Sequence, residues 1–79
     1  MRDSIRDTLR QHARLSVDID ALADEADLYQ AGMTSHATVN VMLALEQTFD
    51  IEFPDQMLRR SVFESIASMQ AALEQLRQA

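Results

Sequence analysis

The sequence has 79 residues, of which 47% are hydrophobic, and its formal net charge is −6 at pH 7. This length supports one small hydrophobic core, and the hydrophobic fraction predicts a folded chain rather than a disordered one. We therefore expect a single domain over residues 1–79. The sequence contains no cysteine, which excludes a disulfide framework, a thiolate nucleophile and a cysteine-based metal site.

The sequence shows no apolar segment of the kind that directs or anchors a protein to a membrane. It does not open with an apolar signal segment, and its longest apolar run, Val41 to Leu45, is too short to cross a bilayer. We expect a cytoplasmic protein that makes no membrane contact.

Charge is distributed unevenly along the chain. Residues 1–15 carry a net charge of +2, residues 16–58 contain nine acidic residues and no Lys or Arg, and residues 59–79 carry +1. An acidic middle segment repels nucleic acid and membrane surfaces, and it would attract a basic partner. Composition alone favours the simpler interpretation, in which these acids only make the surface soluble.

The first predicted helix runs from Asp3 to Leu15. Three apolar residues recur at every fourth position and should face the core, namely Ile5, Leu9 and Ala13.

Four arginines recur with the same spacing on another face of this helix. A nucleic-acid-binding face is disfavoured, because Asp3 and Asp7 interleave with the arginines and no aromatic residue accompanies them. The pattern predicts a solvated helix face that contains Arg2, Arg6, Arg10 and Arg14.

A long connection, residues 16–34, follows the first helix, and a loop of this length in so small a domain is often functional. Its expected anchors in the core are Leu22, Leu28 and Tyr29. A second helix should begin at Thr34 and Ser35 and end near Phe49. Its apolar stripe is predicted to contain Val39, Met42, Leu45 and Phe49.

The rest of the chain predicts two further helices. Pro54 prevents the second helix from continuing, and a short helix is expected from Gln56 to Arg60. Ser65 should cap a last helix whose core face contains Ile66, Met69, Leu73 and Leu76. Because no strand pattern beyond "IEF" is convincing, the sequence predicts an all-α fold, a small four-helix bundle with three longer helices, one short helix and a long first loop.

The stretch "AGMTSHA", residues 31–37, contains the only glycine of the sequence, three residues before Ser35. Gly32 allows a tight or left-handed turn, Thr34 can cap the second helix, and the helix amides favour an anionic group there. Two interpretations remain open: Ser35 carries a phosphodiester, or it is a second capping hydroxyl. Geometry alone favours the second.

The motif around Ser35 resembles that of the acyl and peptidyl carrier proteins. The segment "DLYQAGMTSHATVNVMLALEQTFDIEFPD" contains an Asp-Leu-aromatic anchor, then Gly, two residues, a serine, and a helix followed by Asp, Ile and Pro-Asp. The resemblance implies a helical carrier with 4′-phosphopantetheine attached to Ser35. A phosphopantetheinyl transferase would attach this arm, whose thiol would replace the missing cysteine.

The sequence departs from the usual family pattern beside the serine. Thr34 stands where Asp is usual and His36 where Leu is usual, while Ala37 and Asn40 replace acids that dock basic partners in fatty-acid carriers. Val39 and Leu43 are further candidates for apolar docking. The predicted partner contacts are therefore Thr34, His36, Ala37, Val39, Asn40 and Leu43. We expect partners to approach them and the acidic middle segment.

The resemblance is nearest to stand-alone carriers that are loaded with an amino acid by ligases similar to seryl-tRNA synthetases. A fatty-acyl or polyketide carrier that serves acyl-transferring enzymes is the first alternative. A small acidic interaction or adaptor domain is the second. We expect a monomer that is not an enzyme, because His36 does not naturally reach the adjacent serine hydroxyl and no Gly-x-Ser-x-Gly elbow is present. His12 and His36 are too far apart in sequence to suggest a metal site.

Overall fold

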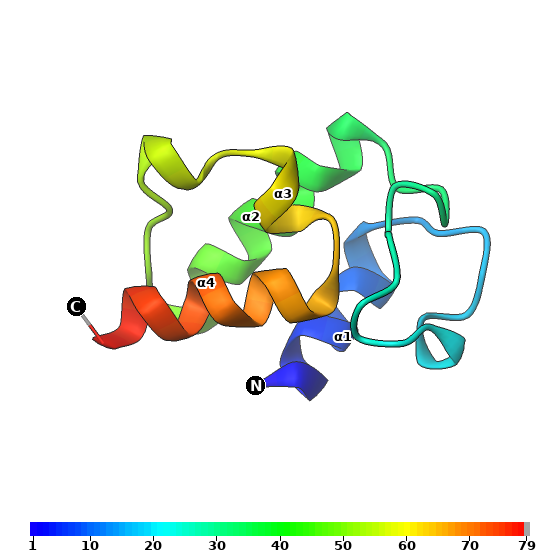
Figure 1. The fold of residues 1–79 in the computed structure, drawn as a ribbon, viewed down its shortest axis with the longest axis horizontal. Coiled ribbons are helices and arrows are strands. Elements are labelled where there is room, and N and C mark those ends of the chain that lie inside the picture. Colours follow the sequence, from blue (N-terminus) through cyan, green and yellow to red (C-terminus); the bar gives the residue numbers. More distant parts are fainter. Residues whose placement is uncertain (79) are drawn as a thin grey trace.

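The computed structural model describes residues 1–78 and shows four α-helices: α1 (Arg2–His12), α2 (Ser35–Phe49), α3 (Arg60–Phe63) and α4 (Ile66–Gln78) (Figure 1). Two short 3₁₀ turns interrupt the connections, η1 (Ile19–Ala21) and η2 (Asp55–Met57). Within the described residues there is no strand. The all-α prediction with three longer helices, one short helix and a long first loop is confirmed.

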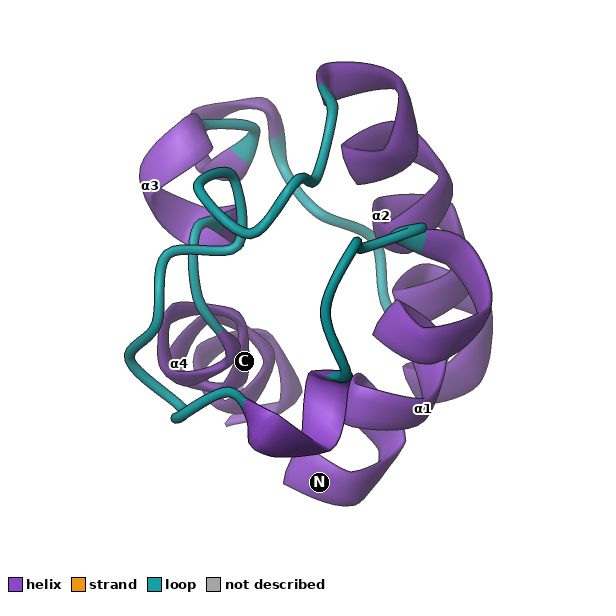
Figure 2. Cartoon of the chain, turned by 90° about the vertical axis from the view of Figure 1, so that its right-hand side faces the viewer, coloured by secondary structure: helices purple, strands orange, loops and turns teal. Residues whose placement is uncertain are grey.

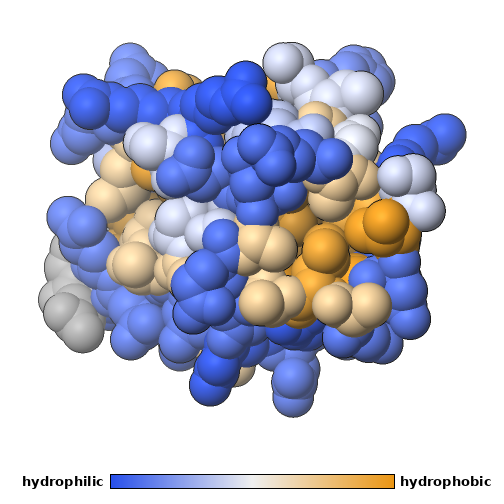
Figure 3. All heavy atoms as spheres, turned by 45° about the vertical axis from the view of Figure 1, so that its right-hand side comes forward, coloured by the Kyte–Doolittle hydropathy of each residue, from blue (hydrophilic) through white to orange (hydrophobic). Residues whose placement is uncertain are grey.

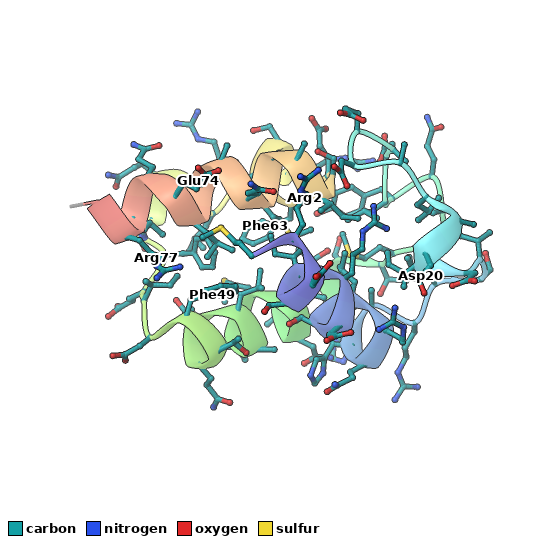
Figure 4. All side chains as sticks on the ribbon, turned by 90° about the horizontal axis from the view of Figure 1, so that it is seen from below. Arg2, Asp20, Phe49, Phe63, Glu74 and Arg77 are labelled. Carbon is teal, nitrogen blue, oxygen red and sulfur yellow. The ribbon has the colours of Figure 1, made fainter. Side chains whose placement is uncertain are left out.

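The helices are arranged around the middle of the molecule, as a view nearly along α4 shows (Figure 2). Their buried apolar side chains form one core. Each longer helix turns one stripe of side chains inward, and α3 adds Phe63, whose ring contacts that of Phe53 edge to face with 5.3 Å between centroids. Figure 4 shows Phe63 between α4 and α2. Burial of these side chains provides the main free energy of folding. The largest fully buried ones are Ile5, Leu9, Leu28, Val41, Leu45, Ile66, Met69 and Leu73.

Two predicted helices end or begin elsewhere than expected. The first helix ends at His12 and not at Leu15, because Arg14 has a positive φ of 53° that no α-helix contains. The short helix expected from Gln56 to Arg60 is replaced by η2 and by α3, which begins at Arg60. The intervening Leu58 has ψ 66°, outside the helical region, so the chain turns between the two.

The buried stripe of α2 also differs from the predicted one. Ala37, Val41 and Leu45 are the buried residues of this helix, whereas Val39 is 50% exposed. The predicted stripe followed the largest apolar side chains, but the helix is rotated so that only Leu45 of that stripe is fully buried. Met42 and Phe49 are partly buried at the edge of the core.

The predicted solvated arginine face is wrong for Arg6. Its guanidinium donates hydrogen bonds to the carbonyl oxygens of Ile19 (2.6 Å) and Leu22 (3.0 Å) and to the carboxylate of Asp24 (2.8 Å). Arg2 and Arg10 are exposed, yet Arg2 pairs with Asp24 and Arg10 with Asp20 (labelled in part in Figure 4). The arginine stripe therefore fastens the long loop to α1.

Figure 3 brings forward the side on which Figure 1 shows the long loop, and apolar atoms lie there among hydrophilic ones. Within the loop, Val17 is 46% exposed, while Ile19 and Leu28 are buried. The loop therefore covers part of the core although it contains no α-helix. No helix among residues 1–78 is long and apolar enough to span a membrane.

Candidate functional site

The loop that leads to Ser35 is held by its own turn. The carboxylate of Asp27 accepts a hydrogen bond from the N–H of Tyr29 (2.9 Å), which is typical of an Asx turn. Leu28 is fully buried, and its N–H donates to the carbonyl of Glu64 at 2.7 Å. The predicted anchor Leu28 thus connects the loop to Glu64, between α3 and α4, while the predicted anchor Tyr29 is partly buried against the core.

Gly32 makes the turn that brings the chain to the start of α2. Its φ is +114°, a value that residues with a Cβ rarely adopt. The N–H of Gly32 donates to the carbonyl of Tyr29 (3.2 Å), and the N–H of Met33 donates to that of Leu28 (3.0 Å). Met33 is buried, so this tight turn is anchored in the core directly before the helix. The only glycine of the sequence therefore makes the turn that places Ser35 at the start of α2.

Thr34 caps α2, as the sequence predicts. Its hydroxyl oxygen accepts a hydrogen bond from the N–H of Ala37 at 3.0 Å, and its φ of −88° and ψ of 166° are extended. Ser35 is the first residue of the helix and is exposed. Because Thr34 supplies the capping oxygen, the hydroxyl of Ser35 is available for chemistry.

A groove of about 370 Å³ opens beside Ser35, between α2 and α3. Two contacts join residues that line it: the Tyr29 hydroxyl accepts a hydrogen bond from Thr38 Oγ1 (3.2 Å), and the Arg60 guanidinium lies 4.3 Å from the centre of the Tyr29 ring. The groove is mainly apolar but has two arginines at one edge. Its lining residues are Tyr29, Ser35, Thr38, Val39, Met42, Leu58, Arg59, Arg60 and Phe63.

A second hollow of about 310 Å³ lies between the end of α1 and the start of α2. It brings His12, the last residue of α1, and the two residues after it next to Gly32 and Thr34, which lie 18 to 22 positions later in the sequence. Its lining is more polar than that of the groove and consists of His12, Ala13, Arg14, Gly32, Thr34, His36, Ala37 and Asn40.

The structure separates the predicted partner contacts into exposed and buried ones. His36 and Asn40 are exposed in the second hollow, and Val39 and Leu43 are about half exposed. Ala37 differs from the expectation for a contact residue, because only 4% of it is exposed and its methyl group packs in the core. Thr34 is exposed but is engaged as the cap.

Sequence reasoning did not associate Leu58, Arg59 and Arg60 with Ser35. These residues lie more than 20 positions after the serine, and the sequence predicted only that they belong to a short helix from Gln56 to Arg60. The one available signal was the arginine pair itself, which ends a segment that otherwise contains no Lys or Arg. The tertiary fold brings this pair to the groove.

The residues around Ser35 fit a covalently attached phosphodiester. The serine is exposed at the start of a 15-residue helix, whose free amides and dipole favour negative charge. Arginines stand at the edge of the adjoining groove, and no acidic residue lines it. An extended, partly apolar group attached to Ser35 would find that groove next to it.

Comparisons with known proteins point to the same chemistry. A curated relative, the aminoacyl carrier protein of Agrobacterium fabrum, is 47% identical over 70 residues, which cover 89% of this chain and 84% of that protein. A carrier protein from Agrobacterium tumefaciens was solved in complex with an engineered Bradyrhizobium japonicum glycine:[carrier protein] ligase and AMP. That structure matches with a TM-score of 0.91 and 44% identity, over 94% of this chain and 99% of the other.

A third match connects the fold with a loaded carrier. It comes from the crystal structure of Bradyrhizobium japonicum glycine:[carrier protein] ligase complexed with glycylated carrier protein. The TM-score is 0.69 and the identity 27%, over 90% of both chains. Residues 3–73 also match the family described as "Phosphopantetheine attachment site". The chain is therefore a homologue of the aminoacyl carrier proteins and belongs to the phosphopantetheine-binding family of carrier proteins.

Proposed function

We propose that the chain is a single carrier domain over residues 1–79 that presents an amino acid to other enzymes on an arm attached to Ser35. The observation that carries this proposal is the position of Ser35 itself. Its hydroxyl is exposed, stands at the first position of α2, and is relieved of capping by Thr34. When bound, 4′-phosphopantetheine supplies a thiol that holds the cargo as a thioester.

The residues near Ser35 bind and position, and they perform no catalysis in this proposal. The turn at Gly32 and the cap at Thr34 fix the start of α2. The amides of the first helical turn and the arginines at the groove stabilise the negative charge of a phosphodiester. The adjacent groove, with Tyr29 held by Thr38, offers a surface along which an arm can lie.

A small cargo suits the way in which the core is packed. Leu28, Val41 and Leu45 are fully buried in the core, so a long acyl chain inside the bundle would have to separate the helices, and one outside it would expose apolar surface to water. A polar aminoacyl group needs no such cavity. The relatives support an amino acid, since one is an aminoacyl carrier protein and another is a glycylated carrier.

The first experiment tests the attachment site. The chain is incubated with coenzyme A and a broad phosphopantetheinyl transferase, and the intact mass is measured for the wild type, for Ser35→Ala and for Ser61→Ala. Ser61 is a matched control, because it is another exposed serine near the start of a helix. We expect the mass of one arm on the wild type and on Ser61→Ala and none on Ser35→Ala. A wild type that gains no arm would favour an interaction or adaptor domain.

The second experiment tests the cargo. The modified wild type is offered glycine with a glycine:[carrier protein] ligase and, separately, a long fatty acid with an acyl-carrier synthetase. We expect an aminoacyl mass increase with the first enzyme and a much slower reaction with the second. Efficient fatty-acid loading without amino acid loading would assign the chain to the fatty-acyl or polyketide carriers. These enzymes would meet the chain in the cytoplasm.

A further inference from the structure

The two hollows beside Ser35 contain basic residues and no acidic ones. The groove between α2 and α3 is bordered by Arg59 and Arg60. The hollow on the other side contains His12, Arg14 and His36. The first turn of α2 likewise has no acidic residue. We call these five side chains the basic rim of Ser35.

Residues 16–58 contain nine acidic residues, but most of those with a hydrogen-bond partner bind to other parts of the fold. Five accept hydrogen bonds within the fold, and four of these lie in the long loop before Ser35. The pairs join Asp18 to the N–H of Asp20, Asp20 to Arg10, Asp24 to Arg2 and Arg6, Asp27 to the N–H of Tyr29, and Glu46 to the N–H of Phe53.

The other acids of this segment do not approach Ser35 along α2. Asp50 and Glu52 follow the end of this 15-residue helix, which lies about 20 Å from its start at 1.5 Å per residue. Asp55 is only three residues before Leu58 of the groove, but it lines neither hollow. Glu25 belongs to the long loop and lines neither hollow. The negative net charge of the chain therefore does not describe the surface at the attachment serine.

Exposed apolar side chains lie next to the basic rim. Val39 and Leu43 stand one helical turn apart on α2 and are 50% and 49% exposed. Leu58 from the groove is 47% exposed. Large apolar groups in water, bordered by charged ones, are typical of the centre of a protein–protein contact. They are three of the five large hydrophobic residues that are exposed among those described.

From these observations we propose that the surface around Ser35 docks onto an acidic patch of the enzyme that loads the carrier. The apolar residues Val39, Leu43 and Leu58 form the centre of this contact, and the basic rim pairs with carboxylates of the enzyme. The proposal rests on the proposed function, since it concerns the partner of the same site. It reverses the expectation from composition that a basic enzyme approaches the acidic middle segment.

The net charge of −6 helps to orient the carrier as it approaches an acidic enzyme. The net negative charge repels an acidic enzyme, whereas the basic rim attracts it to the surface around Ser35. The carrier is thereby turned so that Ser35 faces the enzyme. Charges at the edge of an interface act in this way mainly on the association rate and on orientation.

Variants that add a carboxylate to the basic rim test the proposal with the folded protein after the arm has been attached. His36→Glu adds a carboxylate in the first turn of α2, where the helix dipole favours negative charge, so folding is not weakened. Arg59→Glu changes an exposed side chain beside the groove. Arg77→Glu is the matched control, because Arg77 is exposed near the end of α4 and Figure 4 shows it toward the same end of the molecule as Phe49, the last residue of α2.

The measurements are the rate and the dissociation constant of binding to a glycine:[carrier protein] ligase at low and high salt. Circular dichroism checks the folding of each variant. We expect His36→Glu and Arg59→Glu each to weaken binding several-fold and together about tenfold or more, with Arg77→Glu within about twofold of the wild type. Added salt should slow association of the wild type and narrow the difference between wild type and variants.

The outcomes separate this proposal from the proposed function. If the wild type is loaded with glycine and the two rim variants bind as well as Arg77→Glu, the acidic docking surface is wrong and the carrier function stands. Stronger binding by the rim variants would show that the enzyme presents a basic surface and would overturn the proposal. A wild type that gains the arm but is never loaded by an amino acid ligase contradicts the proposed cargo and, with it, this partner.

Discussion

Arg6 donates a hydrogen bond to the carboxylate of Asp24 at 2.8 Å, although the two residues are 18 positions apart in the sequence. The same guanidinium also binds the carbonyl oxygens of Ile19 and Leu22. A single side chain of α1 thus holds three points of the loop that leads to Ser35. The planar guanidinium suits this role, since its donors are rigidly arranged.

Replacing Arg6 should therefore loosen the long loop. We expect Arg6→Ala to lower the free energy of unfolding by about 1–3 kcal/mol, because two carbonyls and a carboxylate lose their donor. Arg6→Lys should recover only part of this loss, since an ammonium group cannot reproduce the fork. Urea unfolding followed by circular dichroism measures the effect. Gln11→Ala, an exposed change on the same helix, should stay within about 0.5 kcal/mol.

Acid should release the same contact. Hydrogen bonds from Arg2 and then from Arg6 hold the pKa of Asp24 below its ordinary value. The folded state therefore binds fewer protons than the unfolded state, and the stabilisation is present above the unfolded pKa of about 4 and lost as pH falls through the lower folded pKa. We expect Asp24→Asn to reduce the loss of stability that accompanies acidification below about pH 4. Glu52→Gln, which changes an exposed acid, is the control. If the unfolding free energy of Asp24→Asn falls with pH as steeply as that of Glu52→Gln, this assignment is wrong.

The turn before the attachment serine should not tolerate a side chain. Gly32→Ala places a Cβ at φ +114° and 3.4 Å from the Ser16 hydroxyl oxygen. We expect a loss of more than about 1 kcal/mol in unfolding free energy, caused by the backbone conformation. The double variant with Ser16→Ala separates the causes. Recovery of stability in that double variant would show that the contact, and not the φ angle, excludes a side chain.

Replacing Thr34 should affect the stability of the fold more than replacing Ser35. Thr34→Ala removes the oxygen that accepts from the N–H of Ala37, and we expect a loss of about 1 kcal/mol. Ser35→Ala should change the unfolding free energy by less than about 1 kcal/mol, while Thr34→Ser should resemble the wild type. Thermal and urea unfolding measure these values. If Ser35→Ala proved more destabilising than Thr34→Ala, Ser35 would be a structural residue.

The sequence by itself determined most of the helix-forming segments and placed Ser35 at the start of a helix. Apolar spacing of three and four residues predicted the stripes of α1 and α4, and Gly32 and Thr34 marked the start of α2, because such signals act over one or two helical turns. The family motif added the expected chemistry, since its residues lie close together in sequence. Local patterns predicted the structure least well near Leu58, because they placed the short helix at Gln56 to Arg60 whereas α3 begins at Arg60.

Only the tertiary structure decided which charges meet. The arginine stripe of α1 looked solvated because its carboxylate and carbonyl partners lie 10 to 22 residues away in a loop without periodicity. Likewise, the basic rim of Ser35 combines residues from α1, α2 and the start of α3, which no sequence window contains. Electrostatic interactions depend on distance in space, so the net charge of a segment could not tell which acids are bound within the fold and which basic groups surround the serine.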